Sequence, residues 1–175
     1  MKVAKLFLFI AVFGSLLCSE SLSDDGTRRK PFTQTLFVDK DQFYSSNVDS
    51  SYYITPDNHL QIFAGEKLFI EAKAEGSKVI LLRKVDKITD SSSTIIFSFT
   101  QSAENKKHQM MMLTVQNPFN KVLKYKAKML MMGFDKWYGT SIMPVEPKIS
   151  GIEIWNEIIT SLNLFDFTVA DKGKK

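Results

Sequence analysis

The stretch that decides the fold is LQIFAGEKLFIEAKA, which runs from Leu60 to Ala74. Every second residue from Leu60 is apolar apart from Glu66, and the positions between them after Lys67 are mostly charged. Successive side chains of a strand point to opposite faces of the sheet. The stretch therefore predicts β-structure with one face in a core and the other in water.

Similar short runs recur along the chain, separated by turn residues. The expected strands after the first stretch cover residues 78–85, 94–101, 109–116, 121–132 and 165–169. Residues 39–58 have the Ser, Asp and Asn content of a loop. About seven strands at this spacing are typical of an all-β, antiparallel two-sheet sandwich. We expect an immunoglobulin-like sandwich, with a small β-barrel as the alternative.

One segment has helical spacing instead. Trp155, Ile158, Ile159 and Leu162 fall at positions i, i+3, i+4 and i+7. This spacing places apolar side chains on one side of a helix. It predicts one short helix near residues 152–160.

The N-terminus has the features of a signal peptide. Lys2 and Lys5 precede an apolar run from Leu6 to Leu17, and small residues follow at Ser21 and Ser23. The run is shorter than the roughly 20 residues of a membrane-spanning helix. We expect residues 1–23 to be a signal peptide and the protein to be exported, secreted or periplasmic. Lipidation at Cys18, giving an outer-surface lipoprotein, is the alternative.

The rest of the chain reads as a single domain. We expect a flexible leader at residues 24–33, the β-domain at residues 34–170 and a disordered tail at residues 171–175. Cys18 is the only cysteine, so a chain cut after residue 23 would have no disulfide. No later apolar run is long enough for a transmembrane segment in the mature chain.

The sequence favours a non-enzymatic protein. Its histidines are His59 and His108, and neither Gly-x-Ser-x-Gly nor His-Glu-x-x-His occurs. No motif indicates a cofactor. The net charge of +4 is too small for the basic footprint of a nucleic-acid-binding protein. We expect a binding or interaction module whose protein or surface partner is unknown.

Methionine supplies an alternative function. On a regular strand His108, Met110 and Met112 would share one face. Thioether and imidazole groups suit copper(I), and His108-Gln109-Met110 resembles the His-x-Met part of sites in exported β-sandwich copper carriers. The resemblance implies an exported copper(I)-binding carrier. The other interpretation is that these methionines fill gaps in the core.

Two further groups are candidates for partner binding. Lys124, Lys126 and Lys128 alternate with apolar residues and would project from one strand face. Such a row either binds an anionic surface or keeps an outer sheet face solvated. Phe134, Trp137 and Tyr138 lie in a Gly- and Pro-containing segment. They either form an exposed partner patch or cover one end of the core.

Overall fold

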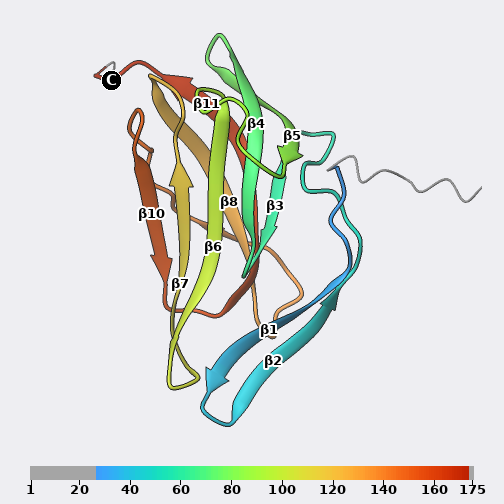
Figure 1. Ribbon diagram of the computed structural model, residues 1–175. Coiled ribbons are helices and arrows are strands. Elements are labelled where there is room, and N and C mark those ends of the chain that lie inside the picture. The colour runs from blue at the N-terminus through green and yellow to red at the C-terminus, as the bar shows by residue number, and fades with distance from the viewer. Residues whose placement is uncertain (1–26, 174–175) are drawn as a thin grey trace, which may run out of the picture.

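The computed structural model describes residues 27–173, which form β-strands and no helix (Figure 1). The eleven strands of this region are β1 (Phe32–Asp39), β2 (Gln42–Val48), β3 (Leu60–Phe63), β4 (Lys67–Glu75), β5 (Lys78–Val85), β6 (Thr94–Glu104), β7 (Lys107–Gln116), β8 (Val122–Met131), β9 (Tyr138–Thr140), β10 (Ser150–Trp155) and β11 (Ile159–Ala170). All their pairings are antiparallel. The predicted all-β antiparallel fold is confirmed.

Nine of these strands belong to one curled sheet, and β1 and β2 form a separate hairpin. The order in the sheet is β10-β7-β6-β4-β5-β11-β8-β9, with β3 paired to β11. Strands β5 and β11 are joined only where Lys78 pairs with Thr168. The sheet bends at this corner, so that the half-sheet β10-β7-β6-β4-β5 covers the half-sheet of β3, β11, β8 and β9 (Figure 1). The two facing half-sheets resemble a sandwich, and their connection through one curled sheet resembles a barrel.

The core lies between the two half-sheets and follows the alternation in the sequence. In β4 the side chains of Leu68, Ile70 and Ala72 are buried. In β8 the buried residues alternate with the exposed lysines. In these two strands the inward positions are the ones that the sequence predicts.

The short helix expected near residues 152–160 is wrong. This segment contains the end of β10, a turn and the start of β11. Residues 159–162 are all buried, and the Gln34 side chain of β1 reaches this part of β11 and donates a hydrogen bond to the Thr160 carbonyl at 2.9 Å. A strand that is buried on both faces does not alternate between apolar and polar residues. The apolar residues of this segment fall at helical spacing by coincidence.

The segment before the domain is partly built into it. Within residues 27–33 of the expected flexible leader, Arg29 is buried, Phe32 is half-buried and the other residues are exposed. The Arg29 guanidinium donates to Glu66 Oε1 at 3.1 Å and to the Gln61 carbonyl at 2.7 Å. The loop expected at residues 39–58 contains β2. The residues of β2 are exposed or half-buried except for Val48, which is buried. With little burial on either face, β2 shows no apolar alternation.

The two ends of the chain are only partly described. The expected signal peptide at residues 1–23, including Cys18, lies outside the described residues. In the expected tail, Asp171 and Lys172 make exposed ion pairs with Lys121 and Glu146, and residues 174–175 are not described. Within residues 27–173 there is no helix of the length and apolarity needed to span a membrane.

Candidate functional site

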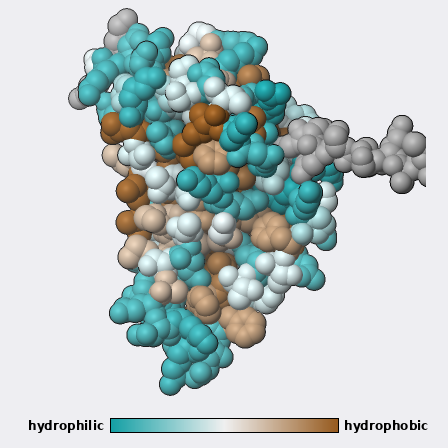
Figure 2. Space-filling view, in the orientation of Figure 1, coloured by the Kyte–Doolittle hydropathy of each residue, from teal (hydrophilic) through white to brown (hydrophobic). Residues whose placement is uncertain are grey.

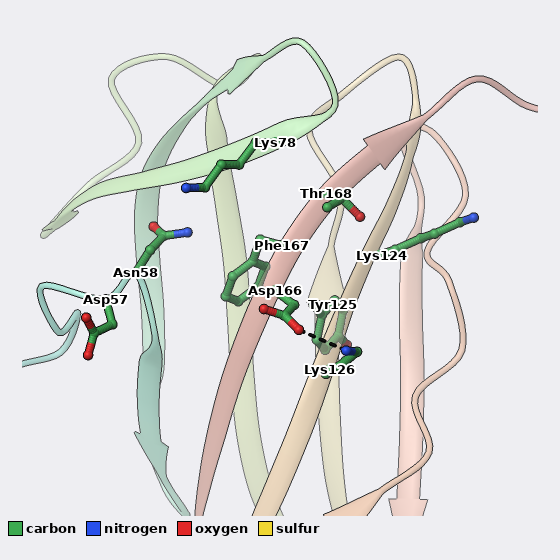
Figure 3. A pocket seen from close by; sticks show the side chains of 9 residues that line it. All are labelled: Asp57, Asn58, Lys78, Lys124, Tyr125, Lys126, Asp166, Phe167 and Thr168. Carbon is green, nitrogen blue, oxygen red and sulfur yellow. Dashed lines mark ion pairs between the residues drawn. The ribbon is translucent and has the colours of Figure 1, made fainter.

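A large pocket opens where β11 changes its neighbour. From Ser161 to Leu164 the strand pairs with β3, and at Thr168 it pairs with β5. Neither β3 nor β5 pairs with residues 165–167 on that side. The gap is an open pocket of about 680 Å³ at the corner between the half-sheets (Figure 3). We call it the corner pocket; its lining comprises Asp57, Asn58, Lys78, Lys124, Tyr125, Lys126, Asp166, Phe167 and Thr168.

A bulge in β11 shapes the lower wall of this pocket. The pairing with β8 shifts between Phe165 and Thr168. Within the bulge Asp166 has a φ of 56°, which is unfavourable for a residue with a Cβ atom. The bulge turns its carboxylate to Lys126, and the two groups form an ion pair at 2.9 Å (Figure 3). Strained backbone of this kind is concentrated at functional sites in proteins.

The floor of the corner pocket is aromatic. The rings of Tyr125 and Phe167 are stacked with centroids 5.6 Å apart, and both residues are buried. Burial raises the pKa of the Tyr125 phenol well above its usual value, and the negative charge of Glu153 raises it further. The phenol therefore stays neutral at physiological pH, and the floor carries no charge.

A tight turn forms the rim opposite the bulge. Asn58 has a φ of 63°. Its Nδ2 donates to the Val79 carbonyl at 2.9 Å, and its Oδ1 accepts from the Leu81 N–H at 2.7 Å. These bonds fix the turn to β5, so the rim is rigid rather than a loose loop.

Only two of the three lysines in the predicted row lie at the corner pocket. Lys124 and Lys126 line the corner pocket, whereas the ammonium of Lys128 lies 5.5 Å from the centroid of the Phe165 ring. Lys78, Asp166 and Thr168 were not among the predicted site residues. They come from β5 and β11, and the pairing of β11 with β5 on one side and with β8 on the other brings them beside the lysines.

The predicted copper ligands do not lie together. The β6–β7 pairing shifts between Ala103 and Ser102, so Gln109 interrupts the alternation between His108 and Met110. His108 instead shares a hydrogen bond with the side chain of Gln101. Gln101 is paired across the two strands with the buried Met111. Residues paired directly across strands share a face. His108 is thus on the inward side with Met111, away from Met110 and Met112.

Both ring nitrogens of His108 have partners. Nδ1 lies 2.9 Å from Gln101 Nε2, and Nε2 lies 2.9 Å from the Asn156 carbonyl oxygen. An amide NH₂ only donates and a carbonyl only accepts, so Nε2 carries the hydrogen. A copper ion at His108 would have to displace one of these partners.

The predicted aromatic patch lies at the turn between β8 and β9. Phe134 and Trp137 are exposed, and Phe134 meets Tyr138 edge to face with centroids 5.5 Å apart. Tyr138 pairs with Met129, further along β8 than the two lysines of the corner pocket. None of these three aromatic residues lines the corner pocket.

A second apolar surface was not predicted. Ile152 and Ile154 of the edge strand β10 are more than half exposed. Figure 2 shows brown and tan atoms along this edge of the molecule. Sequence alternation did not identify β10, because its inward positions are Gly151, Glu153 and Trp155 while its isoleucines point outward.

Comparison with known proteins gave no match among protein-family models, curated proteins or solved structures. Within residues 27–173 no three His, Cys, Asp or Glu side chains are grouped so that they could hold a metal ion. The geometry of the corner pocket is therefore the main basis for a functional proposal.

Proposed function

We propose that this protein is an exported, non-enzymatic binding module that holds a small ligand in the corner pocket. The observation that carries the proposal is an open pocket of about 680 Å³ with an aromatic floor and a charged rim. Small-molecule sites usually have volumes of about 300–1,000 Å³, with apolar walls and a few polar groups. The corner pocket matches this description.

The construction of the pocket supports binding by a pre-formed site. Its walls come from β5, β8 and β11 and from the turn at Asp57 and Asn58. Asn58 and Asp166 are two of the few residues other than glycine with positive φ in the described chain. Surrounding structure must hold such residues in place, so the walls keep their shape without a ligand.

The proposal of export rests on the sequence of residues 1–23. N-terminal sequencing of the protein from its native host tests it. We expect a mature end between Ser19 and Asp24. An intact Met1 in the cytoplasm would contradict export, and a lipid on Cys18 would place the protein on a membrane surface.

A fragment titration tests the binding function. The purified, isotopically labelled protein is mixed with small aromatic and aliphatic compounds, and amide chemical shifts are followed by NMR. We expect saturable shifts at Lys78, Tyr125, Phe167 and Thr168. Shifts confined to the β8–β9 turn would move the binding site to Phe134 and Trp137. The absence of saturable shifts with every compound would contradict the proposal.

A further inference from the structure

The upper wall of the corner pocket is a cross-strand row of two lysines and a threonine. Thr168 of β11 pairs with Lys78 of β5 on one side and with Lys124 of β8 on the other. Neighbouring strands are about 4.8 Å apart. Both lysine side chains are long enough to reach an atom placed above Thr168. In Figure 3 the two side chains extend away from Thr168 toward opposite sides, so both must turn inward to hold a group above its hydroxyl.

The positive charge of this row is only partly balanced. In the lower wall, Lys126 is already paired with Asp166 at 2.9 Å. Lys124 makes no ion pair within residues 27–173. Lys78 helps to lower the pKa of Glu75, but the carboxylate of Glu75 bonds mainly to Lys73 at 2.6 Å. The row can therefore accept a further negative charge.

Uncharged aromatic surface lies below this charged row. Phe167 and Tyr125 form the floor, and the raised pKa of Tyr125 keeps its phenol neutral. The aliphatic stems of the lysines add further apolar surface. Asp57, on the rim, disfavours a second anionic group at that end. A ligand that fits has one negative head and an uncharged, apolar body.

Building on the binding function proposed above, we propose that the corner pocket binds a small organic oxyanion. Lys78 and Lys124 hold the carboxylate or phosphate group above the Thr168 hydroxyl, and the body of the ligand rests against Phe167 and Tyr125. Hydrogen bonds between an ammonium group and an oxyanion are among the stronger ones in proteins. The head group therefore supplies most of the selectivity.

Pairs of one anionic and one uncharged compound with the same aromatic ring test this ligand class. Benzoate is compared with benzamide, and phenyl phosphate with phenol, by NMR titration of the purified protein. We expect the anion of each pair to bind at least about tenfold more tightly, the ratio that corresponds to one charge-assisted hydrogen bond. The relative strength of benzoate and phenyl phosphate identifies the preferred head group. High salt should weaken the binding of the anions and leave the binding of the neutral compounds unchanged.

Lysine variants test whether the preference for anions comes from Lys78 and Lys124. Lys78→Gln and Lys124→Gln should each weaken the binding of the anions about tenfold. Lys128→Gln is the matched control, because Lys128 is exposed on the same strand but outside the corner pocket. A well-dispersed amide spectrum shows that each variant is folded.

Two results would overturn the inference in different ways. If neutral and anionic compounds shift the pocket amides with equal affinity, the pocket binds ligands but not oxyanions, and the binding function stands. If no compound shifts these amides, the binding function fails as well. Equal weakening by Lys128→Gln would attribute the preference to general surface charge and would also overturn the proposed site.

Discussion

Phe97 of β6 and Phe167 of β11 meet edge to face across the interior, with ring centroids 6.1 Å apart. They belong to opposite half-sheets, and both are fully buried. Phe167 also forms the floor of the corner pocket. This contact therefore connects the packing of the two half-sheets to the shape of the candidate site.

Truncation of either ring should destabilise the protein strongly. We expect Phe97→Ala and Phe167→Ala each to lower the free energy of unfolding by about 3–5 kcal/mol, because each leaves a cavity in the core. Urea unfolding followed by circular dichroism measures the change. Phe43→Ala is the control, since Phe43 is 66% exposed and should change stability by less than about 0.5 kcal/mol. Losses below about 1 kcal/mol at both core positions would contradict the inward assignment.

The buried Arg29 should anchor the N-terminal hairpin. Its guanidinium bonds to Glu66 and the Ser51 hydroxyl and lies over the Phe63 ring. Arg29→Ala leaves the Glu66 carboxylate without this partner, so we expect a loss of about 3 kcal/mol in the free energy of unfolding. Chemical denaturation measures it.

Two further variants separate the effect of the ion pair from the loss of the side chain. Arg28→Ala removes an exposed neighbouring arginine and should cost less than about 1 kcal/mol. The double variant Arg29→Met with Glu66→Leu removes both charges and should recover much of the lost stability. An Arg29→Ala protein as stable as the Arg28→Ala protein would show that the buried pair does not anchor the hairpin.

The sequence predicted some strands that have one buried face, β4 and β8 among them, but not β1 or β10. In β4 and β8 the alternation of apolar and polar residues follows the burial observed in the structure. It failed for β2, which is exposed or half-buried along most of its length, and for β11, which begins with residues buried on both faces. Alternation is a signal only where the two faces of a strand differ in their surroundings.

The candidate site was predicted only in part, for a different reason. Lys124 and Lys126 could be found because they lie on one strand. Their relation to Lys78 and Thr168 depends on pairing between strands far apart in the sequence. No local pattern encodes that pairing. In the same way, the bulge at Gln109, which separates His108 from Met110, follows from the register of β6 and β7.

Glu71 should titrate below its usual range. Its carboxylate accepts hydrogen bonds from Arg83 Nε at 2.8 Å and the Thr89 hydroxyl at 2.9 Å. These bonds lower its pKa in the folded state. Because the folded pKa is depressed, the stabilising contribution is complete above the unfolded value of about 4.3 and is lost as the pH falls through the folded pKa.

Replacement of the arginine tests this assignment. Arg83→Gln should raise the pKa of Glu71 toward its usual value, as measured by carboxyl ¹³C NMR titration. The pKa of Glu75, which is lowered mainly by Lys73, should stay the same and serves as the internal control. An unchanged pKa for Glu71 would show that Arg83 is not the principal cause.

His108 provides the last prediction, which sets the structural interpretation against the copper carrier. Its ring joins Gln101 to the turn at Asn156, and Gln101 in turn bonds to the backbone of Phe37 in β1. We expect His108→Ala to lower the free energy of unfolding by about 1–2 kcal/mol, because two hydrogen bonds are lost. Met110→Leu is the control and should change stability by less than about 1.5 kcal/mol, since it keeps the volume of the side chain.

Copper(I) competition measurements decide between the two interpretations. With His108 turned inward and bonded at both nitrogens, the wild-type protein should not compete with a copper(I) chelator for one equivalent of metal. His108→Ala and Met110→Leu should then show no difference from the wild type. Tight one-to-one binding that either substitution abolishes would instead mean that His108 turns to the face of Met110 and Met112. The protein would then be a copper carrier, and the hydrogen bonds from His108 to Gln101 and Asn156 would belong to its metal-free state.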